Sequence, residues 1–93
     1  MFYVYILASD RNGTLYIGVT NNVAARLALH RSGRGSEFVD RYSVHHLVYV
    51  ETCSRAEEAI QREKQIKKWN RAWKIRLIER DNPEWRDLSD QLF

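Results

Sequence analysis

Cysteine, proline and long apolar runs are scarce in this chain of 93 residues. The single cysteine, Cys53, excludes an internal disulfide and is typical of a reducing compartment, so we expect a cytoplasmic protein. No apolar stretch approaches the roughly 20 residues that span a bilayer, and "MFYVYILASD" has no basic segment before its apolar residues. The sequence therefore predicts neither a membrane helix nor a signal peptide.

The composition is that of an ordinary globular domain with a small excess of positive charge. Hydrophobic residues make up 44% and charged residues 29% of the chain, and the net charge is +3. Positive charge is concentrated in "REKQIKKWNRAWKIR" (62–76), where Glu63 is the single acid among seven basic residues. This distribution favours a partner that carries phosphate groups.

Alternation of apolar and polar residues predicts three strands. Residues 2–8 and 14–20 alternate on either side of the turn Asn12-Gly13, and "VHHLVYVETC" (44–53) reads as a third strand. Along the first two strands, Tyr3, Tyr5 and Tyr16 share one face with Gly18, and alternation places Tyr49 on the same face.

Capping signals predict three helices between and after these strands. Asn21 or Asn22 begins the first helix and Gly33 ends it, and Ser54 with Glu57 forms a capping box before a helix over 55–69. Another helix, over 70–80, begins at Asn70 and stops before Asn82-Pro83. The order ββαβαα predicts an α+β fold, a three-stranded antiparallel sheet flanked by helices.

The chain reads as one domain over residues 1–80 with a tail over 81–93. Four apolar residues in the tail are expected to pack back onto that domain: Trp85, Leu88, Leu92 and Phe93.

Ionisable residues interrupt the helix sides that should be apolar. The apolar stripe of residues 55–73 consists of Ala56, Ala59, Ile60, Ile66 and Trp73. Glu63 falls near the centre of this stripe, where an ionised carboxylate is costly to desolvate unless it is paired or bound to a metal.

The first helix repeats this pattern, because Arg26 and His30 lie one turn apart among its apolar residues. Two interpretations are open. Arg26 and Glu63 can form a buried structural ion pair beside a core histidine, or these groups can form a reaction site with the tyrosines. Gly18 would then leave room for close approach to the strand.

An arginine, a histidine, one carboxylate and tyrosines suit phosphodiester hydrolysis. Arginine binds phosphate, one carboxylate with water and substrate oxygens can hold Mg²⁺, and tyrosine or histidine can position a water. Acyl transfer fits less well, since no nucleophilic serine or cysteine is evident beside the histidine.

Four segments in this order resemble the GIY-YIG nucleases, and most closely the small stand-alone, excinuclease-like bacterial branch. The two strands that name the family read "YVY" (3–5) and "YIG" (16–18) here, with Tyr3 in place of the usual glycine. The arginine and histidine of the family match Arg26 and His30 in "NNVAARLALH", and its glutamate matches Glu63 in "AIQREKQIKKW". The likeness covers about residues 2–80.

The resemblance implies hydrolysis of a DNA strand with one divalent metal, Mg²⁺ or Mn²⁺. Glu63 would hold the metal, Arg26 would stabilise the phosphoryl charge, and Tyr5 and Tyr16 would orient or deprotonate the attacking water with help from His30. A tyrosine acting as base would need nearby positive charge, because its ordinary pKa is near 10. Asn70 lies in the region of an asparagine that assists the site in larger relatives, at a shorter spacing.

Further residues admit two interpretations each. A basic surface of Lys64, Lys67, Lys68 and Arg71, with Arg34 in the loop before it, either guides the DNA backbone or is simply solvated. Trp69, Trp73 and Trp85 either stack on bases or pack in the core.

The functional hypotheses are an endonuclease acting on structured or damaged DNA, with a role in DNA repair, and a non-cleaving nucleic-acid-binding module. We expect a monomer. A third hypothesis is an interaction domain that docks onto a partner protein through the acidic tail. A protein partner that supplies DNA specificity is a separate expectation.

Overall fold

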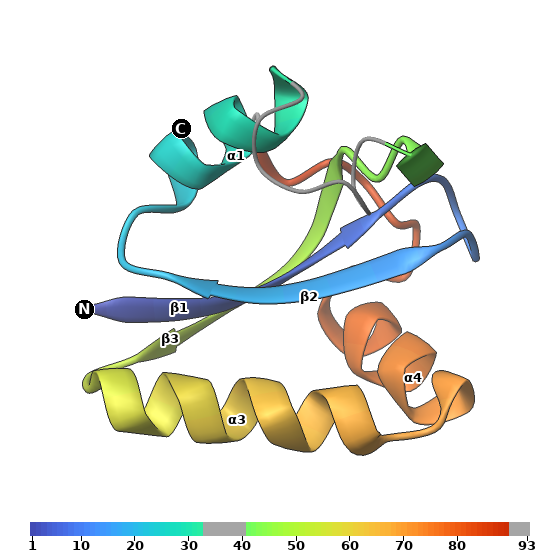
Figure 1. The fold of residues 1–93 in the computed structure, drawn as a ribbon. Coiled ribbons are helices and arrows are strands. Elements are labelled where there is room, and N and C mark those ends of the chain that lie inside the picture. Colours follow the sequence, from blue (N-terminus) through green and yellow to red (C-terminus); the bar gives the residue numbers. More distant parts are fainter. Residues whose placement is uncertain (33–40, 90–93) are drawn as a thin grey trace.

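The computed structural model describes residues 1–32 and 41–89, and its centre is one antiparallel sheet of three strands. The strands are β1 (Phe2–Ala8), β2 (Leu15–Thr20) and β3 (His46–Cys53), in the spatial order β2-β1-β3. β1 therefore lies in the middle with neighbours on both sides, and β2 is an edge strand (Figure 1).

The hairpin of β1 and β2 forms as its alternation predicts. Phe2, Val4 and Ile6 contribute to one apolar cluster, whereas Tyr5 and Leu7 contribute to a second cluster on the opposite face. The turn is closed by a hydrogen bond from the Ser9 N–H to the Thr14 carbonyl, 3.0 Å, and Asn12 adopts a φ of 57° within it.

Helices cover both faces of the sheet (Figure 1). The helix α1 (Val23–Arg31) packs Val23 and Leu27 onto the face that carries Tyr5. The helices α3 (Ala56–Lys68) and α4 (Arg71–Asp81) cover the other face with Ala59, Ile66 and Ile78. The predicted α+β fold with order ββαβαα is confirmed.

Two of the three predicted helix starts are confirmed. The Asn22 side chain accepts a hydrogen bond from the Ala25 N–H, and the Asn70 side chain accepts one from the Trp73 N–H. The capping box at Ser54 is wrong, because the N-cap of α3 is Arg55 and its side chain makes no capping hydrogen bond. The helix α1 ends at Arg31 with Ser32 as its C-cap, and the predicted cap Gly33 lies outside the described residues.

An irregularity in the pairing of β1 with β3 corrects the predicted position of Tyr49. Ile6 pairs with Tyr49 and the next residue, Leu7, pairs with Leu47, which leaves Val48 as an extra residue in β3. The bulge turns Tyr49 onto the face covered by α3 and α4, away from Tyr5.

The first part of the tail packs onto the same body. Trp85 is buried in the cluster beneath α4, and the Leu88 N–H donates to the Leu47 carbonyl at 2.7 Å. Asp87 holds this segment in place by accepting hydrogen bonds from Arg31 and from the Leu47 N–H. Leu92 and Phe93 lie outside the described residues.

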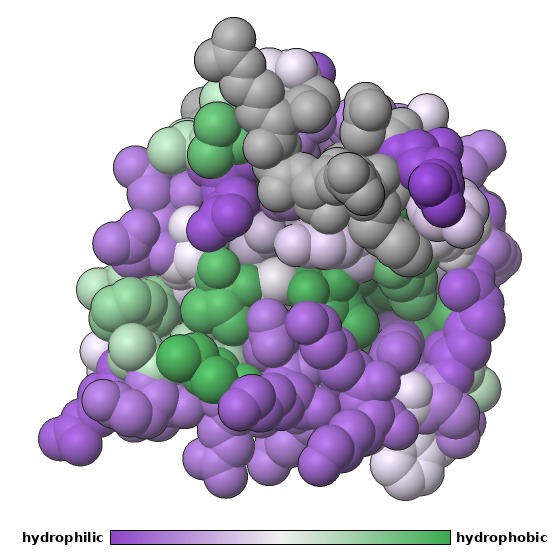
Figure 2. Space-filling model, viewed as in Figure 1, coloured by the Kyte–Doolittle hydropathy of each residue, from purple (hydrophilic) through white to green (hydrophobic). Residues whose placement is uncertain are grey.

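Within the described part of the chain, no helix is both long enough and apolar enough to cross a membrane. Figure 2 shows polar side chains along the lower rim, where α3 lies, and apolar side chains in the band above it.

Candidate active site

The ring of Tyr5 lies over Gly18 on the neighbouring strand β2. The two residues are directly paired in the sheet, and a Cβ atom at Gly18 would lie 2.5 Å from the Tyr5 hydroxyl oxygen. Only glycine accommodates the ring at this distance, because real Cβ contacts are longer. The glycine therefore lets the Tyr5 ring lie across β2, which is the edge strand of the sheet.

His30 of α1 meets Tyr5 above this edge. The Tyr5 hydroxyl and His30 Nε2 are 3.1 Å apart, and both residues are buried, with 1% of each exposed. Tyr16 of β2 completes the group, with its ring centroid 5.3 Å from that of His30 in an edge-on arrangement and 6.3 Å from that of Tyr5. α1 places His30 here because Val23 and Leu27 anchor the same side of the helix to the sheet.

The pKa of the Tyr5 hydroxyl is raised. Burial is the main cause, since it penalises the charged phenolate. The neighbouring Tyr16 hydroxyl and the Glu63 carboxylate raise the pKa further. The Arg26 guanidinium acts in the opposite direction but is outweighed. Tyr5 therefore stays protonated at neutral pH and serves as a hydrogen-bonding group.

The pKa of His30 is lowered, chiefly by burial and then by the positive charges of Arg26 and His45. A charged imidazole needs partners for two N–H groups, but His30 Nδ1 is buried without a hydrogen-bond partner. His30 is therefore neutral at pH 7.

Arg26 lies one turn before His30 on the same side of α1 and is half-buried. Its charge acts on both Tyr5 and His30, which places it beside the pair. Among the described residues it has no carboxylate partner, so its guanidinium remains available for an anionic ligand.

Glu63 reaches this region from the opposite helical layer. α3 packs beneath β1 and β2, and the Glu63 carboxylate is near enough to raise the pKa of Tyr5. Its ion-pair partner is Lys67, one turn along α3, at 3.5 Å, and 19% of the Glu63 side chain is exposed. In the described part of the chain Glu63 does not pair with Arg26, so the interpretation of the two as a structural ion pair is wrong.

A model of the GIY-YIG catalytic domain matches residues 1–76. The chain belongs to the GIY-YIG family. A UPF0213 protein of Staphylococcus haemolyticus is 42% identical over 77 residues, which cover 83% of this chain and 93% of that protein. A UPF0213 protein of Bacillus licheniformis is 40% identical over 87 residues, 94% of this chain and 89% of the other.

A solved structure agrees with the fold of this GIY-YIG domain. The solution NMR structure of a UPF0213 protein from Bacillus halodurans matches with a TM-score of 0.58 at 28% identity. The match covers 99% of this chain and 98% of the other. These three relatives are thus bacterial proteins of about the same length as this chain.

The remaining predicted site residues of the GIY-YIG domain differ in their contacts and exposure. Asn70 caps α4, and Arg71 donates hydrogen bonds to the carbonyl groups of Asn12 and Gly13 at 2.5 and 2.6 Å, which ties α4 to the turn between β1 and β2. Lys64 and Lys68 are exposed on α3. Arg34 lies outside the described residues.

The sequence interpretation missed two features. His45 lies near His30, and its Nδ1 is likewise buried without a partner, whereas the adjacent pair His45-His46 gave no sign of this in the sequence. On the other face, Arg62 donates to Glu51 at 2.9 Å and Tyr49 donates to the same carboxylate at 2.6 Å. Burial and this carboxylate raise the pKa of Tyr49 to about 12.

One side chain of the candidate site suits the divalent metal that GIY-YIG nucleases typically use. Among residues 1–32 and 41–89, no three histidine, cysteine or acidic side chains lie together as a metal site. Glu63 therefore offers a single carboxylate, which fits Mg²⁺ or Mn²⁺ better than zinc, because Mg²⁺ keeps several waters and often binds one or two carboxylates together with substrate phosphates.

Proposed function

We propose that this protein is a divalent-metal-dependent endonuclease that hydrolyses phosphodiester bonds in structured or damaged DNA. One observation carries the proposal. The sheet and the helices on its two faces bring two tyrosines, a neutral histidine, an available guanidinium and a carboxylate to the region of the β2 edge. GIY-YIG family membership supports a nuclease, and the basic surface supports a nucleic-acid substrate.

Arg26 binds the scissile phosphate and stabilises the charge that develops on it. A guanidinium without a carboxylate partner among the described residues is ready for this role, and its partial burial strengthens the interaction.

Tyr16 holds the attacking water. It is the more accessible of the two ring neighbours of His30, since Tyr5 is only 1% exposed. Tyr5 is hydrogen-bonded to His30 Nε2, so the histidine assists by holding the Tyr5 hydroxyl in position. Deprotonation of Tyr5 itself is disfavoured, because its pKa is raised.

Glu63 is the residue that would hold Mg²⁺ or Mn²⁺ in the protein. A bound divalent ion supplies positive charge to the phosphate oxygens and the leaving group. The Lys67 ammonium occupies one carboxylate oxygen in the structure, and because 53% of its side chain is exposed it can move away. Lys64, Lys67, Lys68, Arg71 and Arg34 would guide the DNA backbone toward this point.

A non-cleaving nucleic-acid-binding module is the second candidate. Two observations favour it. Glu63 is a single carboxylate that is already paired with Lys67, and the described residues contain no cluster of three metal-ligating side chains.

The proposal also includes a cytoplasmic location, a role in DNA repair, a monomeric state and a partner that supplies DNA specificity.

A nicking assay separates the two candidates. Supercoiled plasmid and a labelled branched duplex are incubated with the protein in Mg²⁺, in Mn²⁺ and in chelator, beside the Tyr16→Phe variant. An endonuclease gives metal-dependent product that falls at least tenfold in Tyr16→Phe with DNA binding retained. Salt-sensitive binding with no product in either metal would instead establish the binding module.

A further inference from the structure

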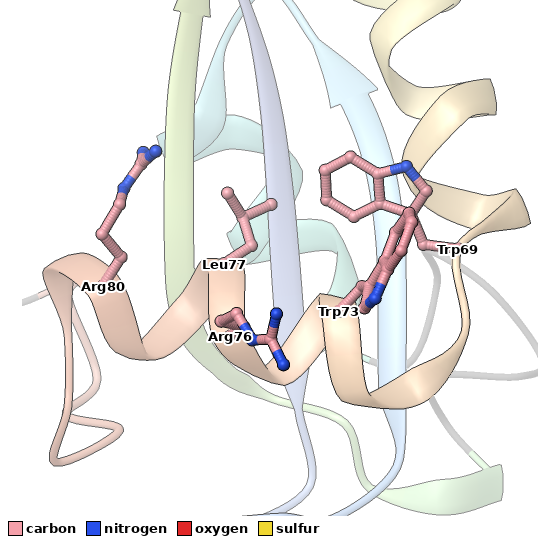
Figure 3. A pocket seen from close by; sticks show the side chains of 5 residues that line it. All are labelled: Trp69, Trp73, Arg76, Leu77 and Arg80. Atoms are coloured by element: carbon pink, nitrogen blue, oxygen red, sulfur yellow. The ribbon is translucent and has the colours of Figure 1, made fainter.

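A second aromatic feature lies in the helical layer, on the other face of the sheet from Tyr5. Trp69, at the end of α3, and Trp73, on α4, line a hollow of about 320 Å³ together with Arg76, Leu77 and Arg80 (Figure 3). None of these residues takes part in the site of Tyr5, Tyr16, Arg26, His30 and Glu63. This tryptophan hollow is therefore a separate feature of the surface.

The two indole rings form an open corner. Their centroids are 6.0 Å apart and their planes meet at 76°, and the Arg62 guanidinium lies 5.1 Å above the centroid of Trp69. Trp73 is 52% exposed, whereas Trp85 is 6% exposed and donates its indole N–H to Glu79. A flat ring stacked on Trp73 would meet Trp69 at the edge-on angle that aromatic pairs favour.

The charge around the hollow selects an anionic ligand. Residues 64–78 hold six basic residues and no acid. Arg76 and Arg80 lie one turn apart on α4 and line the hollow on the same side, and only Arg80 has an acidic partner in the described chain, the exposed Asp81 at 3.3 Å. A ligand that combines flat aromatic rings with regularly spaced negative charges fits this surface, and single-stranded nucleic acid has that chemistry.

We propose that the tryptophan hollow binds an unpaired nucleotide of the DNA substrate, with the base stacked on Trp73 and the adjoining phosphates near Arg76 and Arg80. This inference rests on the proposed nuclease function and narrows the substrate to DNA with a single-stranded segment, such as a flap or a gap. Bases in an intact duplex are stacked on one another and do not present a face to the corner.

The position of the hollow agrees with such a substrate. Trp69 follows Glu63 by six residues, which corresponds to about 9 Å along the axis of α3. Lys67 and Lys68 lie between them at the end of the helix. One strand of DNA therefore spans this distance with only a few nucleotides.

The test compares binding of two labelled ligands by fluorescence anisotropy in chelator, so that cleavage plays no part. The ligands are an oligothymidine and a blunt duplex of the same length. Trp73→Leu is expected to weaken binding of the single strand roughly tenfold, while duplex binding changes less than twofold. Trp73→Phe keeps an aromatic face and should restore most of the affinity. Ile60→Ala is the matched control, because Ile60 is an apolar residue exposed to a similar extent, 45%, on α3.

Two results would overturn the proposal. One is an equal loss for single strand and duplex, or no loss for either. The other is concentration-dependent dimerisation of the wild type in light scattering that Trp73→Leu abolishes, which would assign the hollow to a second copy of the chain. A wild type that binds single strands through Trp73 but cuts nothing would contradict the nuclease function and leave the nucleotide site standing.

Discussion

Tyr5 and Gly18 are paired across β1 and β2, and the absence of a side chain at Gly18 leaves the space that the Tyr5 ring occupies. The glycine is required by this contact and not by a turn, because it lies within a regular strand. The same contact sets the position of the Tyr5 hydroxyl, 3.1 Å from His30 Nε2.

Substitution of Gly18 by alanine should disturb both stability and activity. The new Cβ would lie 2.5 Å from the Tyr5 hydroxyl oxygen and 2.6 Å from its ring carbon Cζ, so the buried ring must move. We expect a loss of about 1–3 kcal/mol in the free energy of unfolding, measured by urea denaturation. Displacement of the hydroxyl should lower the nicking rate roughly a hundredfold.

A double-mutant cycle checks the cause of this loss. In a Tyr5→Ala background the ring is gone, so Gly18→Ala should then cost little stability. An unchanged cost in that background would mean that Gly18 is needed for another reason.

The stability of the protein should fall as the pH falls through about 6.5. The pKa of His30 is lowered in the folded state, so the unfolded chain binds the proton more readily and is favoured in acid. The contribution is fully present above the unfolded pKa and declines as the pH drops from there toward the folded pKa. Urea denaturation between pH 5 and 8 should show this slope, and His30→Gln should reduce it.

Other groups around His30 need their own comparison. Tyr5, Tyr16, Arg26 and His45 face or influence the ring, and His45 is the other histidine among them. The His45→Gln variant measures how much His45 contributes to the slope of stability against pH. His46→Gln is the control, because His46 is exposed. A slope that persists unchanged in His30→Gln would show that His30 is not the group responsible.

Asn70 should matter for stability and not for catalysis. Its side chain accepts the Trp73 N–H at 2.9 Å and caps α4, so Asn70→Ala should cost about 1 kcal/mol in the free energy of unfolding. Asn70→Ser or Asn70→Asp should retain most of that stability, because both residues cap helices well. A nicking rate that falls more than threefold in the well-folded Asn70→Ser variant would instead give Asn70 a part in the site.

Local sequence signals were sufficient for most of the fold. Alternation placed Phe2, Val4 and Ile6 opposite Tyr5, and the caps at Asn22 and Asn70 were readable because side-chain capping is a short-range interaction. A glycine on the tyrosine face of β2 predicts a close approach at Gly18, and the structure identifies Tyr5 as the group that approaches it.

The errors came from features that interrupt the regular spacing of residues along a strand or a helix. The bulge opposite Ile6 and Leu7 shifts the faces of β3, so alternation placed Tyr49 on the wrong side. The helical wheel over 55–73 assumed one continuous helix, but α3 ends at Lys68 and Trp73 belongs to α4. Of that stripe, Ile60 and Trp73 are exposed, while Ala59 and Ile66 are buried.

The sequence was sufficient to predict which residues are candidates for the site, but not which ion pairs and hydrogen bonds they make. Sequence spacing marked Arg26, His30 and Glu63 as unusual residues on apolar helix sides, whereas the choice of Lys67 as partner for Glu63 depends on side-chain packing. The same holds for Arg71, whose hydrogen bonds to the turn at Asn12 and Gly13 depend on how α4 docks against the hairpin.

The most direct test of the central claim, that Glu63 of α3 acts with the tyrosines of the sheet and His30 of α1, is the metal-dependent nicking rate of Glu63→Gln. The matched control is Glu58→Gln, an exposed position on the same helix. The account predicts that Glu63→Gln loses at least a hundredfold in nicking rate, with folding and DNA binding retained, while Glu58→Gln cuts like the wild type. Equal nicking by the two variants would contradict it.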